Sequence, residues 1–424
     1  MKKSDFILAA ALLAGTVWAA PKTEPLVRAE RESAVYKVGE NIKFIVSGPI
    51  ENVTYTVNDG KSDTPAAPLT SREITVKAEA PGFVLVTLYL GKDRRGRDIC
   101  SFGGAAVEPE KIVAGTGRPD DFEQFWQNQI AQMRKSERKV ETVKIDAKYL
   151  PEGFTGYDVK ITQGDVIATG YLVMPVDAGK KSLPVVLNFN GASKVSAELP
   201  VAIRYSKPFK AISFNLNFHG LKNVNLTKKR EYAQEKEMRS QVKNYQYVSG
   251  EDRFAYAMRK IFLRVVLAAD YLQTLPEYNG KLYAIGGSLG GCQAIVCAAL
   301  VPEVDFCVSN ATAMCDHFGK DAGHLPGWPN LFAHNPKAAA AAAYFDVVNF
   351  APMVKCPTRM AVGFVDVTCP PATTYAAYNA LKVSDKKMAH TVTGGHGDRY
   401  DKKELGVFSH HHPELMRLTK KSGK

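Results

Sequence analysis

The sequence predicts a small all-β sandwich over residues 20–112, followed by an α/β domain with a mostly parallel central sheet over residues 113–424. Three observations carry this prediction. Short apolar runs of period two fill residues 35–107, and strand-like runs then alternate with helix-like ones. The length of 424 residues allows two or three domains. A composition of 45% hydrophobic and 23% charged residues is typical of a globular protein.

The first twenty residues have the pattern of an export signal. Two lysines precede an apolar run from Phe6 to Trp18, and a small-x-small pattern ends at Ala19. We interpret residues 1–19 as a signal peptide, which predicts a periplasmic or secreted protein. The run is short for a bilayer span, and no later stretch is long and apolar enough to be one.

The net charge of +12 does not indicate a nucleic-acid partner. The basic residues occur in small scattered groups, without a nucleic-acid-binding motif. No cofactor is expected, because the sequence contains no phosphate loop or dinucleotide fingerprint. No metal is expected either. The seven cysteines lack zinc spacing, and their odd number leaves at least one thiol unpaired within the chain. Most of them are expected to be small buried apolar residues.

Residues 35–107 predict an antiparallel β-sandwich of immunoglobulin-like type. Turn signals at 58–60 and 81–82 separate its alternating runs. These runs contain Ile42, Phe44 and Val46; Val53, Tyr55 and Val57; Ile74, Val76 and Ala78; and residues 83–90. The segment has no histidine and little catalytic chemistry, so a packing or assembly role is expected, with carbohydrate contact as the alternative.

The second domain begins with a helix capped by Asp120 or Asp121, because its apolar residues recur at three- and four-residue spacing. These are Phe122, Phe125, Trp126, Ile130 and Met133. Strand-like runs follow at 185–189, 212–216, 282–285, 360–364 and 390–393, and helix-like runs at 255–272 and 292–300. This alternation predicts a mostly parallel sheet wrapped by helices.

The segment Gly286-Gly287-Ser288-Leu289-Gly290 follows an apolar strand and precedes a helix. Gly-x-Ser-x-Gly in this context is a nucleophile elbow, in which a serine on a sharp turn projects above the sheet. Side chains at Gly286 or Gly290 would collide with the neighbouring strand or helix. The motif therefore predicts an α/β-hydrolase fold with Ser288 as the nucleophile.

A serine nucleophile needs a histidine base, and that base needs a carboxylate to orient it. Hydrolases of this fold place the three in the order Ser, Asp, His. Asp366 ends a strand-like run, and the glycine-flanked His396 follows another. Ser288, Asp366 and His396 are therefore the predicted triad.

Other residues compete for these two roles. Asp346 and Asp385 are alternative acids, and His390 is an alternative base that we expect inside its strand. The histidines His410, His411 and His412 lie in a polar C-terminal segment, where solvation is the expected state.

The oxyanion hole is expected to combine the backbone amide of Leu289 with that of Ala192, which follows an earlier strand. Asn190 is a candidate orienting side chain. Three further candidates for substrate contact are His219, His317 and Trp328, the last through stacking on a sugar ring.

Several segments resemble the acetyl xylan esterase and cephalosporin C deacetylase family, carbohydrate esterase family seven of the α/β-hydrolases. They are Phe122-Glu123-Gln124-Phe125-Trp126, Leu275-Pro276-Glu277, the elbow around Ser288, residues 344–351, and Val365 to Leu381 with its Asp366…Cys369-Pro370-Pro371 pattern. The resemblance runs from about residue 115 to His396, and the N-terminal sandwich is similar only to modules of some exported bacterial relatives.

The resemblance implies removal of acetyl groups from O-acetylated sugars by Ser288, Asp366 and His396, without metal or cofactor. The expected partner is an acetylated oligo- or polysaccharide, xylan or xylo-oligosaccharide above all. Three departures concern the pocket: Leu289 replaces the family's Gln, Asn190-Gly191-Ala192 its His-Gly-Tyr, and His219-Gly220-Leu221 its Arg-Gly-Gln. These leave the pocket and homo-oligomerisation open.

Three alternative functions use the same residues differently. The triad could serve a serine peptidase of the prolyl oligopeptidase type, or a lipid or short-chain esterase. The third alternative is a noncatalytic glycan-binding relative.

Overall fold

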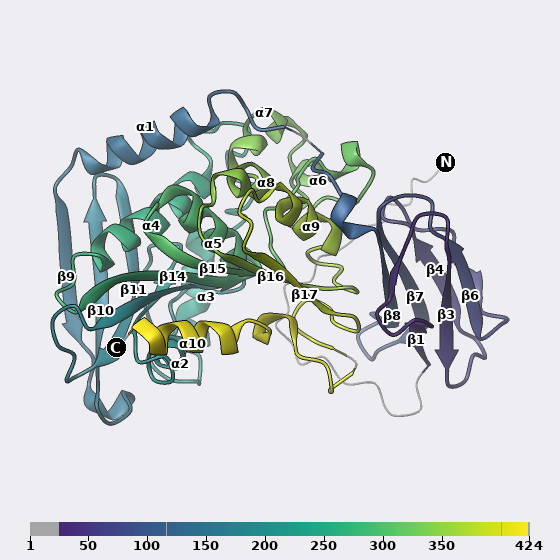
Figure 1. Cartoon of the computed structure of the whole chain (residues 1–424), viewed down its shortest axis with the longest axis horizontal. Helices are drawn as coiled ribbons and strands as arrows, with labels where there is room; N and C mark the ends of the chain where they lie inside the picture. Colours follow the sequence, from purple (N-terminus) through teal and green to yellow (C-terminus); the bar gives the residue numbers. More distant parts are fainter. Residues whose placement is uncertain (1–24, 116, 400, 423–424) are drawn as a thin grey trace.

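Two β-sheets pack against each other in the N-terminal part of the computed structural model, which describes residues 25–115, 117–399 and 401–422 (Figure 1). The predicted signal peptide lies outside these residues. One sheet has the order β1-β3-β6 and the other β2-β8-β7-β4-β5. Their strands are β1 (Leu26–Ala29), β2 (Val35–Tyr36), β3 (Asn41–Ser47), β4 (Thr54–Asn58), β5 (Ala67–Pro68), β6 (Glu73–Lys77), β7 (Gly82–Lys92) and β8 (Asp98–Val107).

The alternation that predicted this sandwich is clearest in β3, where Ile42, Phe44 and Val46 are buried and their neighbours exposed. They meet apolar side chains of β7 in one buried cluster. The prediction of a purely antiparallel sandwich is wrong for one pair, because β2 runs parallel to β8, with Val35 opposite Ala106. A two-residue strand carries too little sequence pattern to indicate its direction.

A nine-stranded sheet of order β17-β16-β15-β14-β12-β13-β11-β10-β9 forms the second part. Its strands are β9 (Arg138–Lys144), β10 (Phe154–Gln163), β11 (Val166–Pro175), β12 (Leu183–Phe189), β13 (Ile212–Asn217), β14 (Tyr278–Gly287), β15 (Val304–Asn310), β16 (Thr358–Gly363) and β17 (Lys386–Thr391). In the half of the sheet that runs β17-β16-β15-β14-β12-β13, all neighbouring strands are parallel. In the other half, β11 is antiparallel to β13, β10 to β11, and β9 to β10. The predicted mostly parallel sheet is confirmed.

Helices cover both faces of this sheet (Figure 1). They are α1 (Phe122–Arg134), α2 (Leu199–Ser206), α3 (Tyr232–Gln241), α4 (Ala257–Leu272), α5 (Leu289–Leu300), α6 (Leu331–His334), α7 (Ala339–Ala342), α8 (Val347–Phe350), α9 (Pro371–Ala380) and α10 (His412–Ser422). Short 3-10 helices are η1 (Pro109–Lys111), η2 (Ala147–Tyr149), η3 (Gly319–Ala322), η4 (Pro336–Ala338), η5 (Ala343–Phe345), η6 (Ala351–Met353) and η7 (Val407–Ser409).

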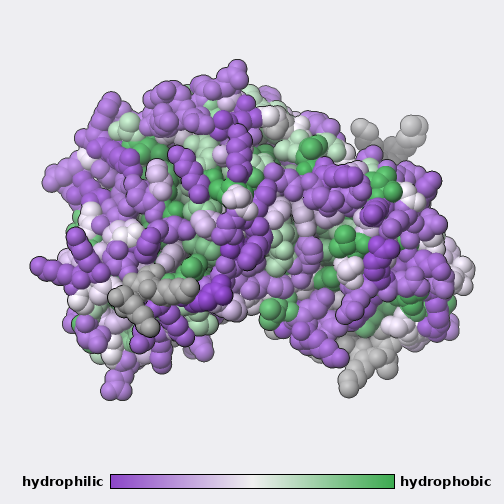
Figure 2. Space-filling model, viewed as in Figure 1, coloured by the Kyte–Doolittle hydropathy of each residue, from purple (hydrophilic) through white to green (hydrophobic). Residues whose placement is uncertain are grey.

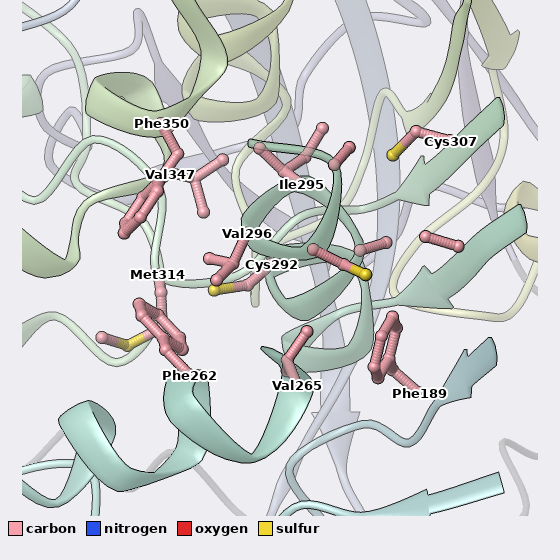
Figure 3. Packing of buried hydrophobic residues seen from close by; sticks show 14 of the residues in the cluster. Phe189, Phe262, Val265, Cys292, Ile295, Val296, Cys307, Met314, Val347 and Phe350 are labelled. Atoms are coloured by element: carbon pink, nitrogen blue, oxygen red, sulfur yellow. The ribbon is translucent and has the colours of Figure 1, made fainter. Parts of the chain in front are cut away.

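Alternate residues of the central strands bury opposite faces. Val185 and Leu187 of β12 join the large cluster with α4 and α5, whereas Val186 packs with Leu415 of α10. Around α5 the packing is dense, with Cys292, Ile295 and Val296 among residues of α4 and α8 (Figure 3). Burial on both faces explains why β12, and β14 from residue 282 to 285, are almost entirely apolar in the sequence.

The predicted boundaries hold best for buried elements. The expected helices 255–272 and 292–300 are α4 and α5, although α5 begins three residues earlier, at Leu289. The expected strand 390–393 is displaced, since β17 spans Lys386–Thr391. The strand β17 begins with two lysines at the edge of the sheet, so its first residues lack the apolar pattern of a strand. No helix among the described residues is both long and apolar enough to cross a membrane, and the surface on the side shown in Figure 2 is mainly hydrophilic.

Candidate active site

Ser288 occupies a sharp turn between β14 and α5, with φ 57° and ψ −127°. Its amide donates to the Asn310 carbonyl at 2.9 Å. The flanking glycines are required by contact, because a Cβ at Gly286 would lie 2.2 Å from the Gly290 carbonyl oxygen. A Cβ at Gly290 would lie 2.3 Å from the carbonyl oxygen of Phe189 in β12. The strained serine conformation and these approaches are those of a nucleophile elbow.

Ser288, His396 and Asp366 form a continuous hydrogen-bonded chain. His396 Nδ1 lies 2.8 Å from Asp366 Oδ2, and His396 Nε2 lies 2.9 Å from Ser288 Oγ. An ionised carboxylate only accepts hydrogen bonds, so Nδ1 donates to Asp366. Nε2 of the neutral imidazole then accepts from the serine hydroxyl. The three residues lie after β14, β16 and β17, and parallel strands bring these loops to one edge of the sheet.

The second oxygen of Asp366 is held by the turn that follows it. Oδ1 accepts hydrogen bonds from the amides of Thr368 and Cys369, both at 2.8 Å. The residue is 3% exposed. These bonds fix the carboxylate so that Oδ2 faces the imidazole.

Two opposing effects act on the imidazole of His396. Burial disfavours its charged form, but the nearby Asp366 carboxylate outweighs burial and raises the pKa of His396 above its ordinary value. The Phe408 ring lies edge-on to the imidazole, with centroids 6.0 Å apart. The site therefore stabilises an imidazolium, which is the state that a general base reaches during catalysis.

Cys369 is a neighbour of the triad that sequence reasoning missed. Its thiol is close enough to His396 and Ser288 for both to act on its pKa. Burial raises the pKa of this thiol, so it is neutral near pH 7 and a poor nucleophile. Its position three residues after Asp366 was visible in the sequence, but the direction of its side chain was not. All seven cysteines are free thiols, and six of them are buried, as expected.

The loop after β12 lies against the nucleophile, since a Cβ at Gly191 would be 3.7 Å from the Cβ of Ser288. Ala192 follows in this loop, and Leu289 is the first residue of α5, with its side chain fully buried. The side-chain amide of Asn190 donates to Asn215 Oδ1 at 3.1 Å, and the backbone carbonyl of Asn190 accepts from the Gln293 side chain. Asn190 thus ties the loop to β13 and α5. The oxyanion donors stay predictions.

The other substrate candidates are mostly buried. His219 and His317 are 7% and 2% exposed, and burial lowers their pKa values to about 3 and about 4. Nε2 of His219 and both ring nitrogens of His317 have no hydrogen-bond partner among the described residues. Trp328 is half-buried, and its carbonyl accepts from the Met314 amide at 2.7 Å. Their contact with substrate stays a prediction.

The competing acids and base have other partners. Asp346 accepts from the amides of Asp316, His317 and Val348, and burial together with the nearby Asp316 raises its pKa above the ordinary value. Asp385 pairs with Arg359 at 2.8 Å. His390 lies in β17, as expected, and its Nε2 contacts the Tyr375 hydroxyl.

The expectation of a solvated histidine run at 410–412 is wrong. His410 contacts Thr391 Oγ1 at 2.9 Å, His411 the Met360 carbonyl at 2.9 Å, and His412 the Tyr205 hydroxyl at 3.1 Å. Each ring is anchored to a different part of the sheet or its helices. The polar sequence predicted exposure, but the segment that leads into α10 and the start of that helix pack against the sheet and its helices.

The fold is that of an α/β-hydrolase, and the elbow has the geometry on which hydrolases of this fold carry a nucleophile. The model of the acetyl xylan esterase family matches residues 111–320 and 333–411. The chain belongs to this family and is a carboxylic ester hydrolase.

Individual relatives agree with this family. Acetyl esterase Axe7A of Xylanibacter ruminicola is 32% identical over 382 residues, covering 84% of this chain and 82% of its own. Two solved structures share the fold: acetyl xylan esterases from a Paenibacillus and a Thermoanaerobacterium species, at TM-scores of 0.61 and 0.56 and 20% and 19% identity. Each comparison covers 74% of this chain and 98% of the other.

Proposed function

We propose that this chain is an exported serine carbohydrate esterase that removes O-acetyl groups from acetylated sugars, with xylan or xylo-oligosaccharides as the substrate class. One observation carries the proposal: the hydrogen-bonded chain from Ser288 through His396 to Asp366. The names of the relatives, acetyl esterase and acetyl xylan esterase, support the acetyl group and the xylan backbone.

In the proposed reaction, Ser288 Oγ attacks the acetyl carbonyl while His396 Nε2 takes its proton. Asp366 holds the imidazole and stabilises its charged form. The amides of Leu289 and Ala192 receive the oxyanion. His396 then returns the proton to the departing sugar hydroxyl. Water, activated in turn by His396, attacks the acetyl-enzyme and releases acetate.

The organisation of the chain belongs to the same proposal. Residues 1–19 direct export to the periplasm or medium. Residues 20–112 form the sandwich domain and residues 113–424 the catalytic domain. Asn190, His219, His317 and Trp328 are proposed to contact the sugar, without a metal or cofactor.

The test is acetate release by the mature protein and its Ser288→Ala variant. The substrates are acetylated xylan, acetylated xylo-oligosaccharides, acetylated sialosides and a short-chain aryl ester. Loss of Ser288 is expected to lower kcat by on the order of 10⁴- to 10⁶-fold. Ser182→Ala, at a partly exposed serine whose hydroxyl donates to the Gly179 carbonyl, is the matched control and keeps full activity.

The alternatives predict other results. A peptidase hydrolyses peptide substrates faster than acetyl esters, and a lipid esterase prefers longer acyl chains. A glycan-binding relative binds sugar without labelling of Ser288 by a fluorophosphonate. Equal acetate release by wild type and Ser288→Ala would overturn the serine mechanism.

A further inference from the structure

The N-terminal sandwich packs directly on the segment that carries Asp366. Phe83 of β7 is 6% exposed, and its ring lies edge-on to Phe364, with centroids 5.2 Å apart. The same ring lies 5.7 Å from Tyr375 of α9. Phe83, Ala34 and Ala106 belong to the large buried cluster of the catalytic part, not to the separate core of the sandwich. The large core of the catalytic part therefore extends into the sandwich, which also has a core of its own.

Backbone also meets backbone at this junction. A Cβ at Gly104 of β8 would lie 2.5 Å from the carbonyl oxygen of Phe364 and 2.8 Å from its carbonyl carbon. Only a glycine permits this approach, because real Cβ atoms essentially never come so close to backbone. The sandwich thus sets the position of the chain two residues before Asp366.

Phe364 is also tied to the loop that carries the base. Its amide donates to the Thr391 carbonyl at 3.1 Å, and the next amide, Val365, donates to the Gly394 carbonyl at 3.1 Å. Gly394 lies two residues before His396. The segments of acid and base are therefore joined to each other directly beside the contact with the sandwich.

Helix α9, which follows Asp366, makes a second contact with the N-terminal part. Asn379 of α9 donates through Nδ2 to the Pro109 carbonyl at 3.0 Å and the Ile112 carbonyl at 2.8 Å. These carbonyls lie in the connection that leaves the sandwich. Asp366 is thus bracketed by Phe364 and α9, and both contact the N-terminal part. Figure 1 shows α9 on the side of the catalytic part that faces the sandwich.

We infer that the N-terminal sandwich is a positioning element of the active site: Gly104 and Phe83 fix Phe364, and through it Asp366, against His396. This inference rests on the proposed serine esterase function. Its physical basis is that catalytic groups must be held within about 0.5 Å of the productive geometry, and a displacement of about 1 Å costs on the order of 10²-fold in rate. Gly104 and Phe83 touch no reacting atom and act through Phe364.

Adjacent glycines of β8 provide a matched pair of variants. Gly104→Ala directs its methyl group at the Phe364 backbone, whereas Gly103→Ala directs it at the Val27 carbonyl oxygen, 2.9 Å away within the sandwich. Both variants add one methyl group to β8, Gly104→Ala at the junction with the catalytic part and Gly103→Ala inside the sandwich. We expect Gly104→Ala to lower kcat by about 10- to 100-fold with KM little changed. Gly103→Ala keeps kcat, whatever its melting temperature.

A second readout needs no substrate. Asp366 and Cys369 are the described titratable groups that act most strongly on His396. An NMR titration of the His396 imidazole therefore reports the Asp366 contact in each folded variant. Gly104→Ala should move the pKa of His396 toward 6.5, and Gly103→Ala should leave it at the wild-type value. If wild type fails to release acetate, the proposed function fails, but this titration still tests the positioning.

A second pair of variants uses milder changes: Phe83→Leu at the junction is the test, and Phe44→Leu is its control. This pair tests the inference if Gly104→Ala does not fold. Phe44 is fully buried in the sandwich's own core. The inference predicts that only Phe83→Leu lowers kcat and the pKa of His396. Two results would overturn the inference. In the first, the folded Gly104→Ala and Phe83→Leu variants keep the wild-type kcat and the wild-type pKa of His396. In the second, the controls Gly103→Ala and Phe44→Leu lose as much kcat as the variants with which they are compared.

Discussion

In the proposed mechanism the protonation of His396 controls the reaction, because only the neutral imidazole accepts a proton from Ser288. Its pKa is raised by Asp366 despite burial, so the basic form appears at higher pH than for a free histidine. We expect kcat/KM to rise with pH, with a midpoint above 6.5. The pH–rate profile on a short-chain aryl acetate measures this midpoint.

The same profile tests the role of the acid. Asp366→Asn removes the negative charge beside Nδ1, so the midpoint should fall toward the ordinary histidine value and kcat should drop by about 10⁴-fold. Asp385→Asn is the control, since Asp385 pairs with Arg359 on the edge of the sheet. An unchanged midpoint in Asp366→Asn would show that the charge of Asp366 does not act on His396.

At the scale of elements, the elbow depends on how closely α5 approaches β12. Gly290→Ala places a methyl group 2.3 Å from the Phe189 carbonyl oxygen and 2.9 Å from its carbonyl carbon. The helix start must move, and overpacking of this kind costs about 1–3 kcal/mol of unfolding free energy. We expect a lower melting temperature together with loss of most activity, because the Leu289 amide moves with the helix.

Gly179→Ala is the matched control for this variant, since a Cβ there meets nothing within 4 Å. It should keep both its melting temperature and its activity. Full activity of Gly290→Ala, measured on the same ester, would show that the elbow tolerates movement of α5.

The elements that sequence reasoning located well are those whose burial is uniform. The strand β12 is buried throughout, and β14 and α5 frame a motif whose glycines have a steric cause. The strand β9 escaped prediction because nearly all of its residues are exposed, so burial imposes no period on them. The parallel pairing of β2 depends on its contact with β8 rather than on its own two residues.

The site divides in the same way. The order of Ser288, Asp366 and His396 and their positions after strands were predictable, since fold topology dictates both. Cys369, Phe408 and the anchoring of His410–His412 were not, because the directions of these side chains depend on contacts between segments distant in sequence. The sandwich's contact with Phe364 likewise follows from the tertiary packing of an otherwise ordinary Gly-Gly pair.

For the whole molecule, the buried histidines make a contribution to the response to acid that is separate from the opposing one of the buried Asp346. Burial lowers the pKa of six of them: His219, His317, His390, His410, His411 and His412. Their neutral forms stabilise the fold above the unfolded-state pKa near 6.5, and this contribution is lost as pH falls. His324 and His396 act in the opposite sense. Burial disfavours their charged forms, but Asp316 raises the pKa of His324 and Asp366 raises that of His396, so their contributions are present at low pH and lost as pH rises.

Among the histidines, six lowered pKa values against two raised ones predict a contribution that lowers the melting temperature from pH 7 to pH 5. His317 isolates the effect, because its pKa of about 4 implies a loss of about 2 kcal/mol between these pH values, at 1.36 kcal/mol per pKa unit. His317→Phe removes the titration from a ring whose nitrogens have no partner among the described residues, so thermal unfolding should depend less on pH. His334→Gln, at an exposed histidine, should retain the wild-type dependence. Equal slopes in all three proteins would mean that His317 is not the neutral, buried group on which this argument depends.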